Sequence, residues 1–153
     1  MQKKYASLLT RLTGLVPLFS IALLSFFMGL QSANAQAIKL QRQGEYTFIT
    51  GGLNDEEQTY LDTQAPKYPI QLVFRNNGQI TEIKDVALRV KNVSGEVMVE
   101  TKTKGPFLYL NPPASGRFTF EADLGSETIS MTKDLIGRRY LHLVFDFNKA
   151  KAD

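Results

Sequence analysis

The strongest constraint on the fold is a series of short runs in which apolar and polar residues alternate. Between residues 86 and 91, Val, Leu and Val alternate with Ala, Arg and Lys. A period of two is typical of a β-strand that buries one face. Further strand-like runs lie at residues 46–50, 70–75, 97–101, 107–110, 117–122, 127–132 and 140–147. Turn-forming residues separate the runs about every ten positions, as in all-β sandwiches.

A different pattern follows the first run. Asn54 can accept a hydrogen bond from an amide in a first helical turn, and Glu57, three residues later, can reach back to the cap. Acidic side chains at this position are also stabilised by the helix dipole. Because Pro66 ends the segment, we expect one short helix over residues 55–64.

These patterns predict an all-β fold. No strand–helix–strand alternation occurs, which excludes a parallel α/β sheet. We expect a seven-stranded antiparallel β-sandwich, of prealbumin-like or immunoglobulin-like type, with one short helix after the first strand. This domain covers residues 45–147, between a flexible arm at residues 36–44 and a flexible tail at residues 148–153.

The first 35 residues differ from the rest of the chain in charge. The 153 residues include 18 Lys and Arg against 15 Asp and Glu, a formal charge of +3. Lys3, Lys4 and Arg11 supply the whole excess, because residues 1–35 contain no acid. The remaining domain is formally neutral, which argues against a nucleic-acid partner.

The same segment has the three parts of a secretory signal peptide. Its basic start is followed by an apolar run at residues 15–30 and by Ser-Ala-Asn-Ala at residues 32–35, so we expect cleavage between Ala35 and Gln36. The alternative is an uncleaved anchor, but the run is shorter than the roughly 20 residues that span a bilayer. We therefore expect a periplasmic or secreted protein that meets the membrane only through its signal peptide, during export.

Two residue types restrict the possible chemistry. The chain has no Cys, which excludes disulfides, thiolate metal sites and cysteine nucleophiles. Its one histidine is His142, and Asp146 lies four residues along the same predicted strand. That spacing separates the two side chains by about 13 Å, too far for a hydrogen bond between them. We expect no catalytic residue and no cofactor.

The densest group of possible metal ligands is the acidic start of the predicted helix, Asp55, Glu56 and Glu57, with Asp62 further on. Adjacent side chains on a helical turn point in different directions, whereas Ca²⁺ needs six to eight oxygens that converge. We interpret this group as a solvated helix start and expect no metal site. The alternative is an enzyme that uses these acids with a metal.

Aromatic residues provide a candidate binding surface. Most of those in the predicted strands occupy core-facing positions. The candidate surface comprises Gly51, Gly52, Tyr109 and Tyr140, in which two glycines end the first strand and two tyrosines lie in later ones.

The order of several segments also points to a family. These segments are EYTFITGG at residues 45–52, YPIQLVF at 68–74, KDVALRV at 84–90, SGEV at 94–97 and GPFL at 105–108. Together they resemble a group of small exported proteobacterial proteins with a carboxypeptidase regulatory-like domain. The proline turn at residues 110–118 departs from that group's Leu-Pro-Pro-Gly-x-Tyr pattern by inserted residues and by Phe118.

The resemblance implies a prealbumin-like seven-stranded sandwich. In carboxypeptidases such a domain accompanies a zinc peptidase domain, but this sequence contains no zinc ligand set, so no activity is carried over. We expect a non-enzymatic exported sandwich that binds another protein or a cell-envelope component through an edge strand or a loop end. The alternative is a periplasmic carrier of a small ligand or glycan.

Overall fold

The computed structural model describes residues 37–80, 82–137 and 139–148. The predicted signal peptide, its cleavage site at Ala35 and Gln36, and residues 149–153 of the predicted tail lie outside the described residues. The described part is mostly β, with two sheets whose strands pair mainly antiparallel and one short α-helix. Of the helices in this part, none has the length and apolar character needed to cross a membrane.

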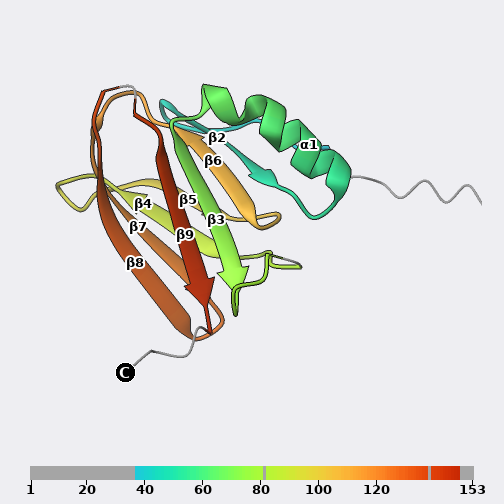
Figure 1. Ribbon diagram of the computed structural model, residues 1–153. Helices are drawn as coiled ribbons and strands as arrows, with labels where there is room; N and C mark the ends of the chain where they lie inside the picture. Colours follow the sequence, from blue (N-terminus) through green and yellow to red (C-terminus); the bar gives the residue numbers. More distant parts are fainter. Residues whose placement is uncertain (1–36, 81, 138, 149–153) are drawn as a thin grey trace, which may run out of the picture. The chain divides into compact units, whose positions relative to one another are not determined.

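The described residues form nine strands in two sheets (Figure 1). The five-stranded sheet has the order β1 (Gln41–Gln43), β2 (Tyr46–Gly51), β6 (Phe107–Asn111), β3 (Ile70–Asn76), β9 (Leu141–Phe147). The four-stranded sheet has the order β5 (Val97–Lys102), β4 (Ala87–Lys91), β7 (Gly116–Leu124), β8 (Glu127–Leu135). The prediction of a mostly β chain with one short helix is confirmed, and the nine strands exceed the seven that we predicted.

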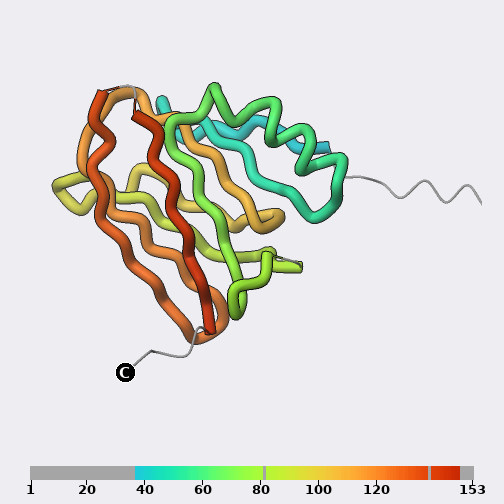
Figure 2. The backbone as a smooth tube through the Cα atoms, in the orientation of Figure 1, coloured from blue at the N-terminus to red at the C-terminus, as the bar shows by residue number. Residues whose placement is uncertain are grey.

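The sheets are also not wholly antiparallel. β9 lies parallel to β3, with Ile70 beside Leu141 and Asn76 beside Phe147. A parallel pair needs a long crossover, because a hairpin reverses the chain. Figure 2 shows that crossover: after β3 the chain builds the other sheet and β6 before it returns as β9. The prediction of a purely antiparallel sandwich is therefore wrong at this pair.

The ends of the domain extend beyond the predicted limits. Gln41–Gln43 form β1, where we predicted a flexible arm, because Gly44 has a φ of 55° that lets the chain turn back into β2. At the other end, the backbone N–H of Asn148 donates to Glu127 at 2.7 Å, and its side chain bonds Asn76 at 2.9 Å. The arm and tail predictions are thus wrong for these residues.

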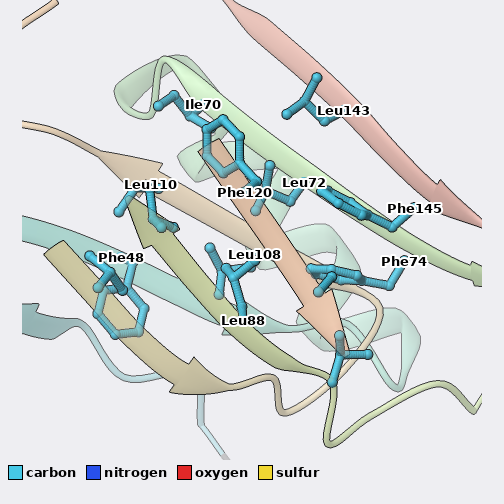
Figure 3. Packing of buried hydrophobic residues seen from close by; sticks show 14 of the residues in the cluster. Phe48, Ile70, Leu72, Phe74, Leu88, Leu108, Leu110, Phe120, Leu143 and Phe145 are labelled. Atoms are coloured by element: carbon cyan, nitrogen blue, oxygen red, sulfur yellow. The ribbon is translucent and has the colours of Figure 1, made fainter. Parts of the chain in front are cut away.

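The inner faces of the two sheets meet in one apolar core (Figure 3). Along β3, Ile70, Leu72 and Phe74 are fully buried, and the ring of Phe74 stacks on that of Phe145 with centroids 5.4 Å apart. Each large apolar side chain that leaves water in this way contributes about 1.5–3 kcal/mol. Burial of the alternating faces therefore holds the two sheets together.

The helix packs on the other face of the five-stranded sheet. α1 (Asp55–Gln64), the helix that the sequence predicts, continues into the short 3₁₀ helix η1 (Ala65–Lys67). Leu61 is the buried residue of α1. It packs in one cluster with Ile49, Tyr68 and Tyr109, on the outer face of the five-stranded sheet. At β2 both faces of the sheet are therefore covered, which explains its unbroken run of buried residues from 48 to 51.

Two backbone segments approach closely beside α1. Gly105, just before β6, lies against the backbone of Gly51 at the end of β2, and a Cβ at position 105 would overlap the carbonyl oxygen of Gly51. Backbone atoms cannot swing aside as a flexible side chain can. Only glycine therefore fits at position 105 without a shift of one strand.

We predict that Gly105→Ala lowers the free energy of unfolding by about 1–3 kcal/mol, the usual cost of overpacking. Gly116→Ala is the matched control, since a Cβ there meets nothing closer than 3.9 Å. Urea denaturation of both variants measures the effect. Equal stability of the two variants would contradict the close approach.

Candidate functional site

A groove of 370 Å³ lies at one end of the sandwich. Three parts of the chain form it: the η1 segment, the turn between β6 and β7, and the loop between β8 and β9. Its lining residues are Pro66, Pro69, Asn111, Pro112, Pro113, Ala114, Ser115, Leu135, Gly137 and Tyr140. Four of the six prolines in the chain are among them, so the walls have little backbone freedom.

Tyr140 is the exposed aromatic residue of the groove, with 52% of its surface accessible. Its hydroxyl donates a hydrogen bond to the carbonyl oxygen of Pro66 at 2.9 Å. The next residue, Leu141, donates its N–H to the carbonyl oxygen of Pro69 at 2.7 Å. These two bonds fix the tyrosine ring beside the prolines, although the groups are more than 70 residues apart in the chain.

Among the described residues that line the groove there is no Asp, Glu, Lys, Arg or His. Proline has no N–H, and the hydroxyl of Ser115 is bonded to the carbonyl oxygen of Gly137 at 3.3 Å. Among the described residues, no hydrogen bond occupies the exposed side chain of Asn111. The groove therefore offers rigid apolar rings together with one amide that can donate and accept.

The four predicted surface residues do not come together. Gly51 and Gly52 are buried where β2 passes into α1, and Tyr109 is 6% exposed beneath the helix. Only Tyr140 is exposed and lines a groove. The predicted surface is therefore wrong for the other three residues, because α1 covers the end of β2 and the middle of β6.

Sequence reasoning did not identify the prolines as site residues. The sequence marks them as residues that end a helix or begin a turn, a role that they also have in the structure. The one signal in the sequence is that two of these prolines precede the predicted strand at residues 70–75 and two follow the predicted strand at residues 107–110. That signal does not show that Pro66 and Pro113 line the same groove, because their proximity depends on how the sheets assemble.

Glu57 holds the entry to α1 through hydrogen bonds to the backbone. Asn54 caps the helix as predicted, accepting the N–H of Glu57 at 2.8 Å. The carboxylate of Glu57 reaches past the cap and accepts the N–H groups of Gly52 at 2.7 Å and Leu53 at 3.0 Å. One carboxylate oxygen thus satisfies two backbone donors that precede the helix.

We predict that Glu57→Ala lowers the free energy of unfolding by about 1–2 kcal/mol, because the part-buried N–H of Gly52 loses its charge-assisted partner. Glu56→Ala is the control, since Glu56 is an exposed acid in the same first turn. Thermal and urea unfolding measure both. A loss as large for Glu56→Ala would assign the effect to the helix dipole alone.

The side chains elsewhere that could support catalysis or bind a metal lie apart from one another or are already hydrogen-bonded to the backbone. In the part of the chain that the structure describes, no three His, Cys, Asp or Glu side chains are grouped so that they could hold a metal ion. His142 is exposed on β9 beside Gln71, whereas Asp146 accepts the N–H of Gly78 at 2.8 Å. The side chains of His142 and Asp146 therefore lie at different places on the surface.

Two tyrosines that pack beneath the helix, Tyr68 and Tyr109, have raised pKa values. Burial raises the pKa of Tyr109 above its ordinary value of 10.0, and the negative charge of Asp62 raises it further. Burial likewise raises the pKa of Tyr68, whose ring centroid lies 6.3 Å from that of Tyr109. The folded protein thus favours the neutral phenols more than the unfolded chain does.

We predict that the free energy of unfolding falls as the pH rises above about 10. The neutral phenol of Tyr109 contributes stability that is fully present below this pH, and the unfolded chain releases its proton first as the pH increases. Urea denaturation between pH 8 and 11 measures the fall, which Tyr109→Phe should reduce. An equal fall in the wild type and in Tyr109→Phe would contradict this origin.

The chain matches no family model and no curated protein sequence. The candidate site therefore rests on three structural observations: the proline walls, the fixed and exposed ring of Tyr140, and the absence of charge among the residues that line the groove.

Proposed function

We propose that this protein is a non-enzymatic binding module that holds an extended, uncharged segment of a partner protein in the groove beside Tyr140. The observation that carries the proposal is the combination of proline walls with an exposed tyrosine ring that a hydrogen bond holds in place. A module of this kind acts by recognition, which fits the separate placement of His142 and Asp146.

Rigidity of the groove supports binding. Association costs free energy wherever side chains and loops must be ordered. Proline has a fixed φ, and Tyr140 is already restrained by its bond to Pro66, so little remains to be ordered when a ligand arrives. Tyrosine also supplies a large contact area at low entropic cost, as it does in antibody paratopes.

The chemistry of the lining indicates the class of partner. The described lining residues carry no acidic or basic side chain, so they favour neither acidic nor basic ligands and suit an uncharged segment. Proline-rich segments in the polyproline II conformation are extended before they bind and dock in aromatic-lined grooves. Tyr140 supplies one exposed aromatic ring for such a segment. Asn111 lies in the same groove and can pair with a backbone amide of such a segment.

A glycan or small-ligand carrier is the second candidate function. The observation that favours it is the pairing of a tyrosine ring with the free amide of Asn111 in one groove. A sugar presents an apolar ring face and hydroxyl groups together, and a few placed polar groups suffice to orient a ligand in an apolar site.

We further propose that the sandwich is prealbumin-like, with an immunoglobulin-like fold as the alternative, and that the chain belongs with the exported carboxypeptidase regulatory-like proteins that it resembles. Two sheets dominated by antiparallel pairs, with a helix after the first long strand, support this assignment. The signal-peptide pattern supports a periplasmic or secreted location.

Titration followed by ¹H–¹⁵N NMR tests the function. The two probes are an uncharged proline- and alanine-rich decapeptide and a linear N-acetylhexosamine oligosaccharide. We expect the peptide to shift the amides of Asn111, Ser115 and Gly137. We expect Tyr140→Ala to weaken binding about tenfold or more, which corresponds to about 1.4 kcal/mol.

Tyr140→Phe and Tyr60→Ala are the matched variants. The first keeps the ring and loses the bond to Pro66, so it should weaken binding less than Tyr140→Ala does. The second removes another exposed tyrosine, on α1 and outside the groove, and should leave binding unchanged. Shifts with the oligosaccharide alone would favour the carrier. No groove shifts with either probe would contradict both functions.

A further inference from the structure

β8 is a long strand at one edge of the four-stranded sheet. β8 pairs with β7 over its whole length, from Glu127 opposite Leu124 to Leu135 opposite Gly116. Among the described residues no strand pairs with its other side, and Figure 1 shows β8 running along the outside of the four-stranded sheet. Unpaired backbone groups on such an edge are a template for another strand.

The opposite edge of the same sheet is partly closed. The side chain of Gln43 accepts the N–H of Glu100 in β5 at 2.8 Å and donates to its carbonyl oxygen at 2.7 Å. One side-chain amide thus takes the two backbone groups that a neighbouring strand would use. β5 is therefore blocked near its middle by the chain itself, whereas β8 has no such block in the part of the chain described.

Apolar side chains at the β8 edge are only partly covered. Ile129 and Met131 lie opposite Ala122 and Phe120 of β7 and pack on the rim of the core, yet both are half-buried. An additional strand beside β8 covers the remaining apolar surface of both residues. β9, the edge strand of the other sheet, exposes Val144 with 40% of its surface accessible and is the competing edge.

The sequence of β8 is complementary to itself. Residues 127–133 read Glu-Thr-Ile-Ser-Met-Thr-Lys. If two copies lie antiparallel with Ser130 opposite its counterpart, Ile129 meets Met131 of the second copy. Glu127, which also accepts the N–H of Asn148 at 2.7 Å within its own chain, then meets Lys133 of the second copy. The hydroxyl residues between them also face one another. Opposite charges and apolar pairs in direct register stabilise antiparallel strands.

Lys133 makes this register selective. It lies opposite Phe118, a core residue, and therefore on the same side of the sheet as Ile129 and Met131. A charge on that side opposes pairing with an arbitrary apolar strand. A second copy of this chain brings Glu127 to it, so the charge that disfavours other partners favours this one.

We infer that β8 is a homodimerisation edge, at which two copies pair antiparallel about Ser130 and join their four-stranded sheets into one. The two copies use the same residues, as a twofold interface requires. The inference does not depend on the ligand of the groove, since the paired residues 127–133 do not line it.

The absence of cysteine from the chain allows a direct test. In the inferred pair the Cβ atoms at position 130 face each other about 4.5–5.5 Å apart, close enough for a disulfide after a small adjustment. Protein purified from cells that express the full chain should therefore give a disulfide-linked dimer with Ser130→Cys under mild oxidation. Ser94→Cys, at an exposed turn, controls for random collision.

Val144→Cys, in the middle of β9, tests the competing edge. Efficient cross-linking at position 130, with little at positions 94 and 144, would support the inference. Equal cross-linking at all three positions, none at any position, or cross-linking confined to position 144 would overturn it.

Charge exchange supplies an independent measurement. By sedimentation equilibrium, Lys133→Glu and Glu127→Lys should each weaken the dimer at least tenfold, because each places like charges opposite each other. The double variant, which swaps the two charges, should restore the wild-type dissociation constant. Lys84→Glu, an exposed change elsewhere, should have no effect. A wild type that stays monomeric at millimolar concentration, or a double variant no stronger than the single ones, would overturn the inference.

Discussion

The hydrogen bond from the N–H of Leu141 to the carbonyl oxygen of Pro69, at 2.7 Å, begins the parallel pairing of β9 with β3. The groove on which the proposed binding rests depends on this hydrogen bond. It sets Tyr140 next to Pro66, and it brings the β8–β9 loop against the turn that follows β6. Without this register the proline walls would still exist, but they would not enclose a groove.

A second consequence concerns where binding can occur. α1 covers the outer face of the five-stranded sheet through Leu61, and the inner faces of both sheets are in the core. On the outer face of the four-stranded sheet, Arg89 and Lys91 form ion pairs with Glu121 and Asp123. These four charges therefore balance one another. The two proposed binding sites, the groove at the end of the sandwich and the β8 edge, lie outside these covered surfaces.

Local structure was largely predictable from the sequence. The alternation from Val86 to Lys91 identified β4, and the Asn54 cap with Pro66 gave both ends of α1. These features depend on neighbours along the chain, which the sequence displays directly. The alternation also identified the inner face of β4, where Leu88 and Val90 are fully buried.

Features that depend on distant contacts were not predictable in this way. β1 exists because Gly44 turns the chain, and Gln43 bonds Glu100, 57 residues away. Burial of Tyr109 follows from the packing of α1 on β6, which periodicity alone cannot reveal. The groove likewise joins residues from three separate segments, so only Tyr140 was identified among its lining residues.

The most direct measurement of the central claim, that the β3–β9 register builds the groove, is an NMR study of the protein without ligand. We expect nuclear Overhauser contacts from the ring of Tyr140 to Pro66 and Pro69, together with slow solvent exchange of the Leu141 amide. Fast exchange of that amide, with no contact between the tyrosine ring and either proline, would contradict the account.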